Sequence, residues 1–308
     1  MTPQIPAKTP APRAALQPLR GVRILSLALN LPGPAALMRC QQMGAQCTKL
    51  EPPPHPSAPA GSSGDPMGSY APKAYATLHA GVKVVTADLK TDAGQKALHK
   101  LLAKTDVLLT SFRPSALKKL GLSWKTLHAQ YPALSQVAIV GAPGARAEEP
   151  GHDLTYLAES GLVQGLDLPP TLYADMGGSL MASEAVLKAR LLQLQKGQGA
   201  QLEVALSDAA TYLALPRQWK LTTPGAAVGG GHAGYRIYPC QDGRVALAAL
   251  EPHFAAALAA EVGLPSAHIM AMFAPATYAA IAAYMASKTR QELNALAAAK
   301  DIPLYTLE

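Results

Sequence analysis

Residues 22–50 decide the fold: they begin Val-Arg-Ile-Leu-Ser-Leu-Ala-Leu and end Gln-Cys-Thr-Lys-Leu. The first run is apolar enough for a buried strand, and Pro32 then opens a helical pattern that continues to about Met43. Gly44 turns the chain into a second strand. We therefore expect a β-α-β unit with parallel strands and a right-handed crossover. The turn lacks Gly-x-Gly-x-x-Gly, so the usual dinucleotide fingerprint is absent.

Strand and helix patterns alternate along most of the chain. Further buried strands are expected at residues 83–88, 107–110, 135–140 and 201–206. Helical patterns are expected at 91–104 and in a long apolar run that ends at Lys196-Gly197. This alternation predicts an α/β fold, with a parallel sheet in a large domain at residues 20–224. Residues 55–73, rich in Pro, Ser and Gly, are expected to form a long surface loop.

The pattern changes after residue 224. A glycine-rich link is followed by a strand that enters an Asp242-Gly243 turn, which is typical of a β-hairpin, and then by alanine-rich helices. We predict a smaller α+β domain at residues 225–300 and a C-terminal return strand at 301–308. Residues 1–19 hold many prolines and no continuous apolar core, so we expect a disordered tail there and no signal peptide.

Composition limits the possible functions. The chain of 308 residues is 49% hydrophobic and can bury a large core, while Lys+Arg 27 against Asp+Glu 20 gives a net charge of +7 that favours an anionic partner. Basic residues are scattered and aromatic residues make up only 5%, which argues against nucleic acid. A small molecule that carries phosphate fits better. No apolar run is long enough to cross a bilayer, so no membrane partner is expected.

The three cysteines, Cys40, Cys47 and Cys240, form no Cys-x-x-Cys pair and have no histidine at ligand spacing. Such spacing is typical of reduced thiols and not of a zinc site. We therefore expect a cytoplasmic protein without a metal site.

Two groups that can move protons stand between Gly151 and Gly178. His152 lies in Gly-His-Asp-Leu-Thr-Tyr, Asp175 lies in Tyr-Ala-Asp-Met-Gly-Gly, and each precedes an apolar helical pattern. An imidazole titrates near neutrality and the pKa of a carboxyl can be raised toward it, so this pair could remove a proton from one side of a carbon and return one from the other. The alternative is a helix-capping aspartate and a structural histidine.

Basic residues follow the strand at 107–110. Arg113, Lys118 and Lys119 come at its carboxyl end and along the next helical pattern. Open α/β sheets bind ligands at this edge, where fixed cations suit phosphate. A solvated basic helix face is an equally good interpretation of these three residues alone.

Taken in order, several motifs resemble those of the type III CoA-transferase family, and most closely its alpha-methylacyl-CoA racemase branch. The likeness extends over nearly the whole chain after residue 18. The motifs that carry it include Gly44-Ala-x-x-x-Lys-Leu-Glu-Pro, Phe112-Arg-Pro, Gly151-His-Asp-Leu-Thr-Tyr-Leu-Ala, Ala174-Asp-Met-Gly-Gly, Tyr238-x-Cys-x-Asp-Gly and Leu250-Glu-Pro-His-Phe.

The resemblance implies racemisation or epimerisation of 2-methylacyl-CoA thioesters by 1,1-proton transfer through an enolate. It makes His152 and Asp175 the opposed acid and base, lets Glu251 hold His152, and places the backbone N–H of Asp153 near the thioester oxygen. The other positions to which it assigns substrate or coenzyme A binding are Gly151, Tyr156, Arg113, Lys119, Lys83 and Lys49.

The resemblance also implies a Rossmann-like large domain joined to a small one, and a homodimer whose two chains interlock. Coenzyme A enters as part of the acyl-CoA substrate, and no prosthetic group is expected. Three departures stand out. His79-Ala-Gly-Val-Lys83 replaces the usual Asn-Arg-Gly-x-Lys, so Ala80 lacks a cation. The loop between His152 and Asp175 is short, which is expected to narrow the acyl pocket, and the chain is shorter than the family at its C-terminal end.

Two other functions stay open. A CoA-transferase would use the carboxylate of Asp175 as a nucleophile and form a mixed anhydride that the CoA thiolate reopens. A catalytically silent protein would bind CoA esters without turnover. The sequence does not decide the acyl group, which ranges over bile-acid precursors, branched fatty acids and small dicarboxylic chains.

Overall fold

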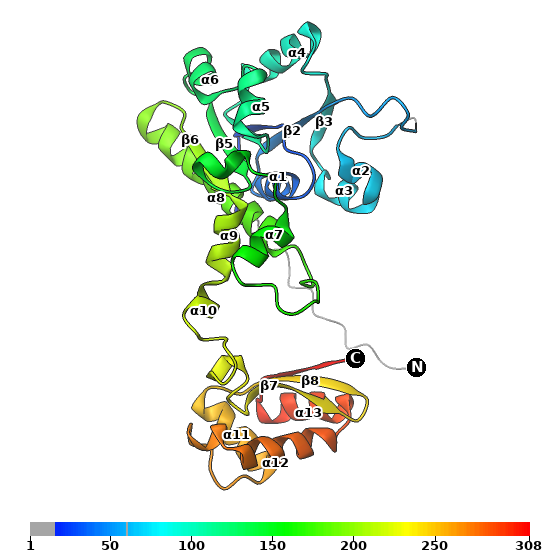
Figure 1. Ribbon diagram of the computed structural model, residues 1–308, viewed down its shortest axis with the longest axis vertical. Coiled ribbons are helices and arrows are strands. Elements are labelled where there is room, and N and C mark those ends of the chain that lie inside the picture. Colours follow the sequence, from blue (N-terminus) through cyan, green and yellow to red (C-terminus); the bar gives the residue numbers. More distant parts are fainter. Residues whose placement is uncertain (1–15, 60) are drawn as a thin grey trace. The chain divides into compact units, whose positions relative to one another are not determined.

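The first β-α-β unit forms as its sequence predicts. In the computed structural model, which describes residues 16–59 and 61–308, strand β1 (Arg23–Ser26), helix α1 (Pro32–Gln42) and strand β2 (Gln46–Glu51) follow one another (Figure 1). Proline suits the start of a helix, where its missing N–H would have no intrahelical partner. Gly44 has a φ of 94° between α1 and β2, a conformation that favours glycine. The two strands pair in parallel.

Six strands form the large sheet, in the order β3-β2-β1-β4-β5-β6, and all neighbours are parallel. The chain moves outward from β1 to β3 and then returns to place β4 on the other side of β1. In open α/β sheets, ligands bind at the carboxyl ends of the strands where the order reverses in this way. The remaining strands of this sheet are β3 (Lys83–Thr86), β4 (Val107–Thr110), β5 (Ser135–Val140) and β6 (Gln201–Ala205).

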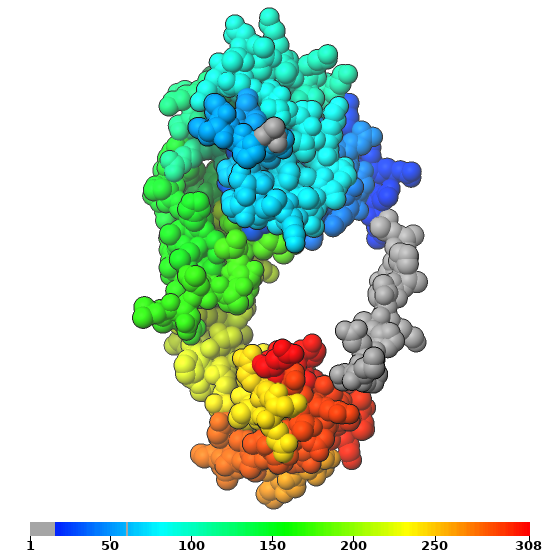
Figure 2. All heavy atoms as spheres, turned by 90° about the vertical axis from the view of Figure 1, so that its right-hand side faces the viewer, coloured from blue at the N-terminus to red at the C-terminus, as the bar shows by residue number. Residues whose placement is uncertain are grey.

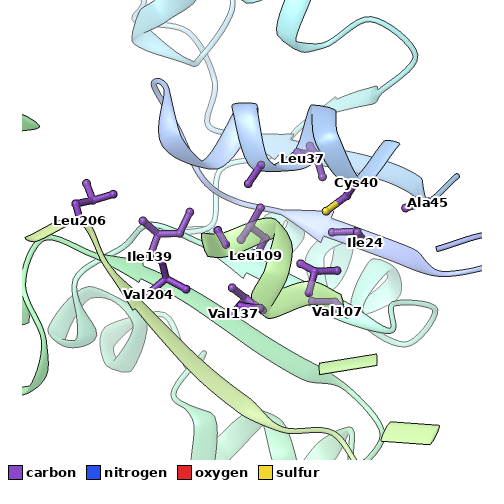
Figure 3. Close-up of a cluster of buried hydrophobic side chains, with 14 of the residues drawn as sticks. Ile24, Leu37, Cys40, Ala45, Val107, Leu109, Val137, Ile139, Val204 and Leu206 are labelled. Carbon is purple, nitrogen blue, oxygen red and sulfur yellow. The ribbon is translucent and has the colours of Figure 1, made fainter. Parts of the chain in front are cut away.

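One face of the sheet packs against α1 and the long helix α8 (Tyr173–Lys196). Figure 3 shows Leu37 of α1 above side chains of β1, β4 and β5, among them Ile24, Leu109 and Val137. These side chains are at most 2% exposed, so their burial holds the layers together. Two shorter helices of the same unit contact each other and α8, namely α7 (Asp153–Glu159) and α9 (Leu206–Leu213).

The opposite face carries a second core made mainly of leucines, such as Leu98, Leu108 and Leu127, all fully buried. The helices that supply it are α4 (Asp92–Leu102), α5 (Pro114–Lys119) and α6 (Trp124–Gln130). With helices on both faces, the sheet has the layered α/β architecture that the alternating pattern predicts.

The predicted surface loop at residues 55–73 is wrong in its second half. Helices α2 (Pro66–Tyr70) and α3 (Pro72–Leu78) occupy this part of the chain, which is light blue to cyan in Figure 2. Asp65 caps α2, because its carboxylate accepts the N–H of Met67 at 2.9 Å. The prolines that suggested a loop stand at the first turns of both helices, a position where proline is favoured.

The chain divides into two compact units, one that ends at Ala214 and one at Leu215–Glu308. The division falls earlier than the boundary predicted after residue 224, because the link begins directly after α9. The second unit holds an antiparallel sheet in the order β7-β8-β9. Its strands are β7 (Tyr235–Cys240), β8 (Gly243–Ala248) and β9 (Leu304–Leu307). Residues 301–308 therefore belong to the small unit, as β9 pairs with β8 there.

The small unit has an α+β composition. Its helices are α10 (Leu215–Gln218), α11 (Pro252–Val262), α12 (Pro275–Ala286) and α13 (Arg290–Lys300). The capping box at the start of α13 is present, since Thr289 and Glu292 each bond the other's backbone N–H. Residues 1–15, which include most of the predicted tail, lie outside the described residues. Within the described ranges, no helix has both the length and the apolar character to cross a membrane.

Candidate active site

A pocket of about 600 Å³ opens at the carboxyl edge of the large sheet. The loop after β1 lines it with residues 29–32, the loop after β4 with 111–113, and the end of β5 with 139–141. These loops stand beside the reversal in strand order, where a ligand site is expected. The volume of this pocket is typical of a small-molecule site, and so is its lining, which is mostly apolar with a few charged groups.

His152 and Asp175 both line this pocket. His152 is the residue before α7, and Asp175 lies in the first turn of α8, so two helix starts meet at one pocket. The two helices are tied together at this point, because the buried carboxylate of Asp153 accepts the backbone N–H of Asp175 at 2.9 Å. The backbone N–H of His152 is fixed in turn by the Thr155 hydroxyl at 3.1 Å.

The carboxyl group of Asp175 is tuned toward neutrality. Burial, reinforced by the Asp153 carboxylate and opposed by His152, raises the pKa of Asp175 to about 6. A carboxyl group with such a pKa accepts and returns a proton near neutral pH more readily than an ordinary aspartate.

Tyr156 brings a hydroxyl to the same pocket. The side chain is 7% exposed, and its hydroxyl has no hydrogen-bond partner among residues 16–59 and 61–308. Two glycines make room for it: a Cβ would lie 2.2 Å from this oxygen at Gly141 and 2.5 Å from it at Gly151. Burial, followed by the charge of Asp175, raises the pKa of Tyr156. A neutral donor therefore faces the pocket beside the carboxyl group.

The predicted phosphate contacts divide into two groups. Arg113 is exposed, directly precedes α5 and lines the pocket, whereas Lys119 lies on α5 outside the pocket lining. A carboxylate stands near both: Glu148 accepts the backbone N–H of Ser115 at 2.6 Å and its hydroxyl at 2.8 Å. These bonds, with smaller contributions from Arg113 and Lys119, lower the pKa of Glu148.

The two other predicted phosphate contacts lie elsewhere. Lys49 is fully buried, and its ammonium group is bonded to Asp65, Glu51 and His79. Its assignment as a contact for coenzyme A phosphates is therefore wrong, because no face of the ammonium is left for a ligand. Lys83 is exposed at the first position of β3 and is not part of the pocket lining.

Glu251, predicted to hold His152, belongs to the small unit, where it directly precedes α11 and is exposed. Because Glu251 and His152 belong to different units, their pairing stays a prediction.

The segment between α7 and α8, residues 160–172, borders the pocket through Leu172. Leu166 and Leu168 of this segment are exposed, at 103% and 75%. This segment joins the two helices that carry His152 and Asp175, so its length affects the space next to both groups.

Several lining residues were not predicted from the sequence. Asn30 and Leu31 come from the loop after β1, Met67 and Tyr70 from α2, and Glu149 from the segment before α7. A usable signal existed for α2, since Asp65-Pro66 is an N-cap followed by a helix-starting proline. Asn30 has a φ of 63°, a conformation that asparagine adopts more readily than most residues, but no sequence signal marked its loop as part of the pocket.

An α/β sheet with a pocket at its carboxyl edge, lined by a histidine, an arginine and several carboxylates, is typical of an enzyme site for a small molecule. Residues 19–308 match the family model CoA-transferase family III. The chain therefore belongs to CoA-transferase family III.

The relatives include both racemases and CoA-transferases. The chain is 29% identical to the alpha-methylacyl-CoA racemase of Mus musculus, over 84% of this chain and 68% of that protein. It is 32% identical to the cinnamoyl-CoA:phenyllactate CoA-transferase of Clostridium sporogenes, over 62% of this chain and 50% of that protein. It is 30% identical to the probable fatty acyl-CoA transferase Rv3272 of Mycobacterium tuberculosis, over 68% of this chain and 54% of that protein. The matched region thus spans from half to about two thirds of these relatives.

Solved structures share the fold. The crystal structure of Rv3272 from Mycobacterium tuberculosis superimposes with a TM-score of 0.79 at 24% identity, covering 96% of this chain and 85% of that one. A CAIB/BAIF family protein from Brucella suis gives a TM-score of 0.73 at 23% identity, covering 95% and 84%. The predicted fold class, a Rossmann-like large domain with a smaller α+β domain, is confirmed.

Proposed function

We propose that this chain racemises 2-methylacyl-CoA thioesters by moving the proton on the α-carbon. The observation that carries the proposal is the meeting of His152 and Asp175 at one pocket, with the pKa of Asp175 raised to about 6. A neutral imidazole on one side removes the α-proton, and a protonated carboxyl group on the other side returns one. The bond to the leaving proton breaks as the enolate forms, and reprotonation from the opposite face inverts the carbon.

The enolate needs stabilisation beyond a base, because a positioned base alone contributes only about 10²- to 10⁴-fold. The backbone N–H of Asp153, the first residue of α7, is proposed to donate to the thioester oxygen, where the charge develops. The Tyr156 hydroxyl is a second donor at the same pocket. Gly151 keeps that hydroxyl in place by leaving room for it.

Coenzyme A is proposed to enter past the exposed cations. Arg113 stands at the pocket and Lys119 further along the same segment, so a chain of phosphates could follow them outward. Mostly apolar residues remain for the acyl group, for example Leu29, Ile139 and Leu206. We further propose, from the resemblance, that Glu251 fixes the tautomer of His152 through a hydrogen bond.

The test is hydrogen exchange in D₂O. An (R)-2-methylacyl-CoA is incubated with the protein and no acceptor acid, while NMR follows the α-proton and a chiral separation follows the configuration. We expect α-deuteration together with inversion. Protein in which Asp175→Asn is the only change serves as the control, and exchange by wild type that is no faster than by this variant contradicts the proposal.

A CoA-transferase is the second candidate, and the relatives of this activity favour it. Asp175 would then attack the thioester carbonyl and release CoA thiolate, which would reopen the mixed anhydride at the aspartyl carbonyl. That step frees the donor acid and leaves CoA on Asp175 as a thioester, from which CoA passes to the acceptor acid through a second anhydride. This activity requires an added acid and produces no α-deuteration without it. The catalytically silent alternative predicts that wild type and Asp175→Asn bind CoA esters equally well and that neither shows racemase or CoA-transferase activity.

A further inference from the structure

A cluster of buried charged groups lies on β2 and the segment that follows it. Lys49 and Glu51 are two positions apart on the strand, so both side chains leave the same face of the sheet. The Lys49 ammonium is bonded to the carboxylate of Asp65, to Glu51 at 3.1 Å, and to Nε2 of His79 at 2.9 Å. The lysine and both carboxylates are at most 1% exposed, and the histidine is 8% exposed.

The hydrogen bonds fix the protonation of this cluster. Nδ1 of His79 lies 2.7 Å from the carbonyl oxygen of Tyr75, which can only accept, so Nδ1 carries the proton and Nε2 accepts from Lys49. An ammonium group has three N–H bonds, and here each finds one acceptor. The acceptor atoms of Glu51, Asp65 and His79 all lie within 4.8 Å of one another, as metal ligands do. The Lys49 ammonium is the cation of this set.

Asp65 connects the cluster to the pocket. Besides Lys49, its carboxylate accepts the backbone N–H of Asn30 at 3.1 Å and that of Met67 at 2.9 Å. Asn30 and Met67 both line the pocket, and so does Tyr70 on the same short helix as Met67. Asn30 has a φ of 63°, a left-handed conformation that asparagine adopts more often than most residues other than glycine, and the Asp65 carboxylate accepts its N–H there.

We propose that Lys49 is a positioning residue of the pocket: by holding the Asp65 carboxylate, it fixes the backbone of Asn30 and Met67 on the wall that receives the acyl-CoA. The inference rests on the proposed function only in taking a CoA thioester as the ligand. Lys49 acts through Asp65 and touches no ligand itself.

The main test variant is Asp65→Asn. It leaves one ammonium and one carboxylate in the cluster, so no unpaired charge is buried and the chain is expected to fold. In either orientation of the new side-chain amide, its NH₂ group faces another donor, either Lys49 or the N–H of Asn30. The hydrogen bonds that fix this pocket wall are therefore lost. Lys49→Met is the second variant. It leaves two buried carboxylates without a cation and is the more severe change.

The matched control is Asp106→Asn. This change breaks another ion pair of the same sheet, in which Asp106 accepts from the Arg23 side chain at 2.9 Å and from its backbone at 2.8 Å. Asp106 is not part of the pocket lining. A purely structural role predicts that control and test variants behave alike, with a lower Tm and unchanged ligand binding.

Binding of acetyl-CoA is measured by calorimetry, and folding by circular dichroism. We expect Asp65→Asn to weaken acetyl-CoA binding at least tenfold, where each factor of ten corresponds to about 1.4 kcal/mol. We also expect it to slow α-proton exchange by about 10²-fold, because a displaced pocket wall misplaces the bound thioester. The control is expected to bind within about twofold of wild type. Lys49→Met, if folded, is expected to match Asp65→Asn.

Binding by Asp65→Asn within twofold of wild type overturns the inference, and so does an equal loss of binding in the control. If wild type binds acetyl-CoA but does not exchange the α-proton of a 2-methylacyl-CoA, the proposed function is refuted. The binding measurements on the variants then still decide the role of Lys49. Wild type that binds no acetyl-CoA overturns both.

Discussion

Replacing Asp175 with asparagine is expected to make the protein more stable at pH 8 while removing the proposed proton transfer. The pKa of Asp175 is raised from 3.8 to about 6, mainly by burial. A raised pKa means that folding favours the protonated form. Its contribution to stability is fully present below pH 3.8 and is lost as the pH rises through about 6. At pH 8 the native protein therefore carries the whole penalty of a buried carboxylate.

The magnitude follows from the size of the shift. Each pKa unit corresponds to about 1.4 kcal/mol, so a shift of about two units gives about 3 kcal/mol, reduced to roughly 2–3 kcal/mol by water in the open pocket. Asp175→Asn should gain this much over wild type at pH 8. At pH 4.5 the gain should fall to about 1 kcal/mol, because the native carboxyl is protonated there and the remaining cost is only that of keeping it protonated slightly above its ordinary pKa of 3.8.

Urea unfolding at the two pH values, with equal m values, measures this difference. Asp208→Asn is the matched control, since Asp208 is exposed in the first turn of α9 and its replacement should change stability by less than about 0.5 kcal/mol at either pH. A variant no more stable than wild type at pH 8, or a gain that does not change with pH, would show that Asp175 is not held in a desolvated site.

Three further outcomes are expected. His152→Ala should slow α-proton exchange of one enantiomer by about 10²- to 10⁴-fold and of the other much less, measured by NMR in D₂O; equal losses would speak against two opposed groups. Arg113→Ala should raise the KM for acyl-CoA and weaken its dependence on salt, with kcat nearly unchanged, as initial rates at two ionic strengths would reveal. Gly141→Ala should lower the free energy of unfolding by about 1–3 kcal/mol, because its methyl group would meet the Tyr156 hydroxyl; the paired change with Tyr156→Phe should recover part of that loss, and no loss in the single variant would refute the contact.

The sheet could be predicted from the sequence because its signals are local. The apolar run at residues 22–29 predicted a buried strand from its own composition, and β1 occupies Arg23–Ser26 of it. Gly44 and Gly197 end helices through their own backbone preferences. The positions of His152 and Asp175 at helix starts followed from the same kind of local pattern. Their meeting at one pocket did not, since it depends on how α7 and α8 pack.

The long-range pairing of buried charges could not be predicted from the sequence. A lysine in a strand, such as Lys49, reads as an exposed cation, and its three partners come from 2, 16 and 30 positions further on. Nothing in the local pattern announces such a cluster, because burial of charge is favourable only when every partner is in place. The case of α2 is different: its cap is local, since Asp65 accepts the N–H of Met67, but the proline-rich composition around it favoured a loop over this signal.

The segment at residues 160–172 joins α7 to α8. It does not fix the positions of His152 and Asp175, because these depend on the two helices and on the hydrogen bond from the Asp175 N–H to the Asp153 carboxylate. Under the proposed function, insertions or deletions there are expected to change the space for the acyl group while leaving His152 and Asp175 in place. Exchanging this one segment is therefore expected to alter ligand preference separately from the groups proposed for proton transfer.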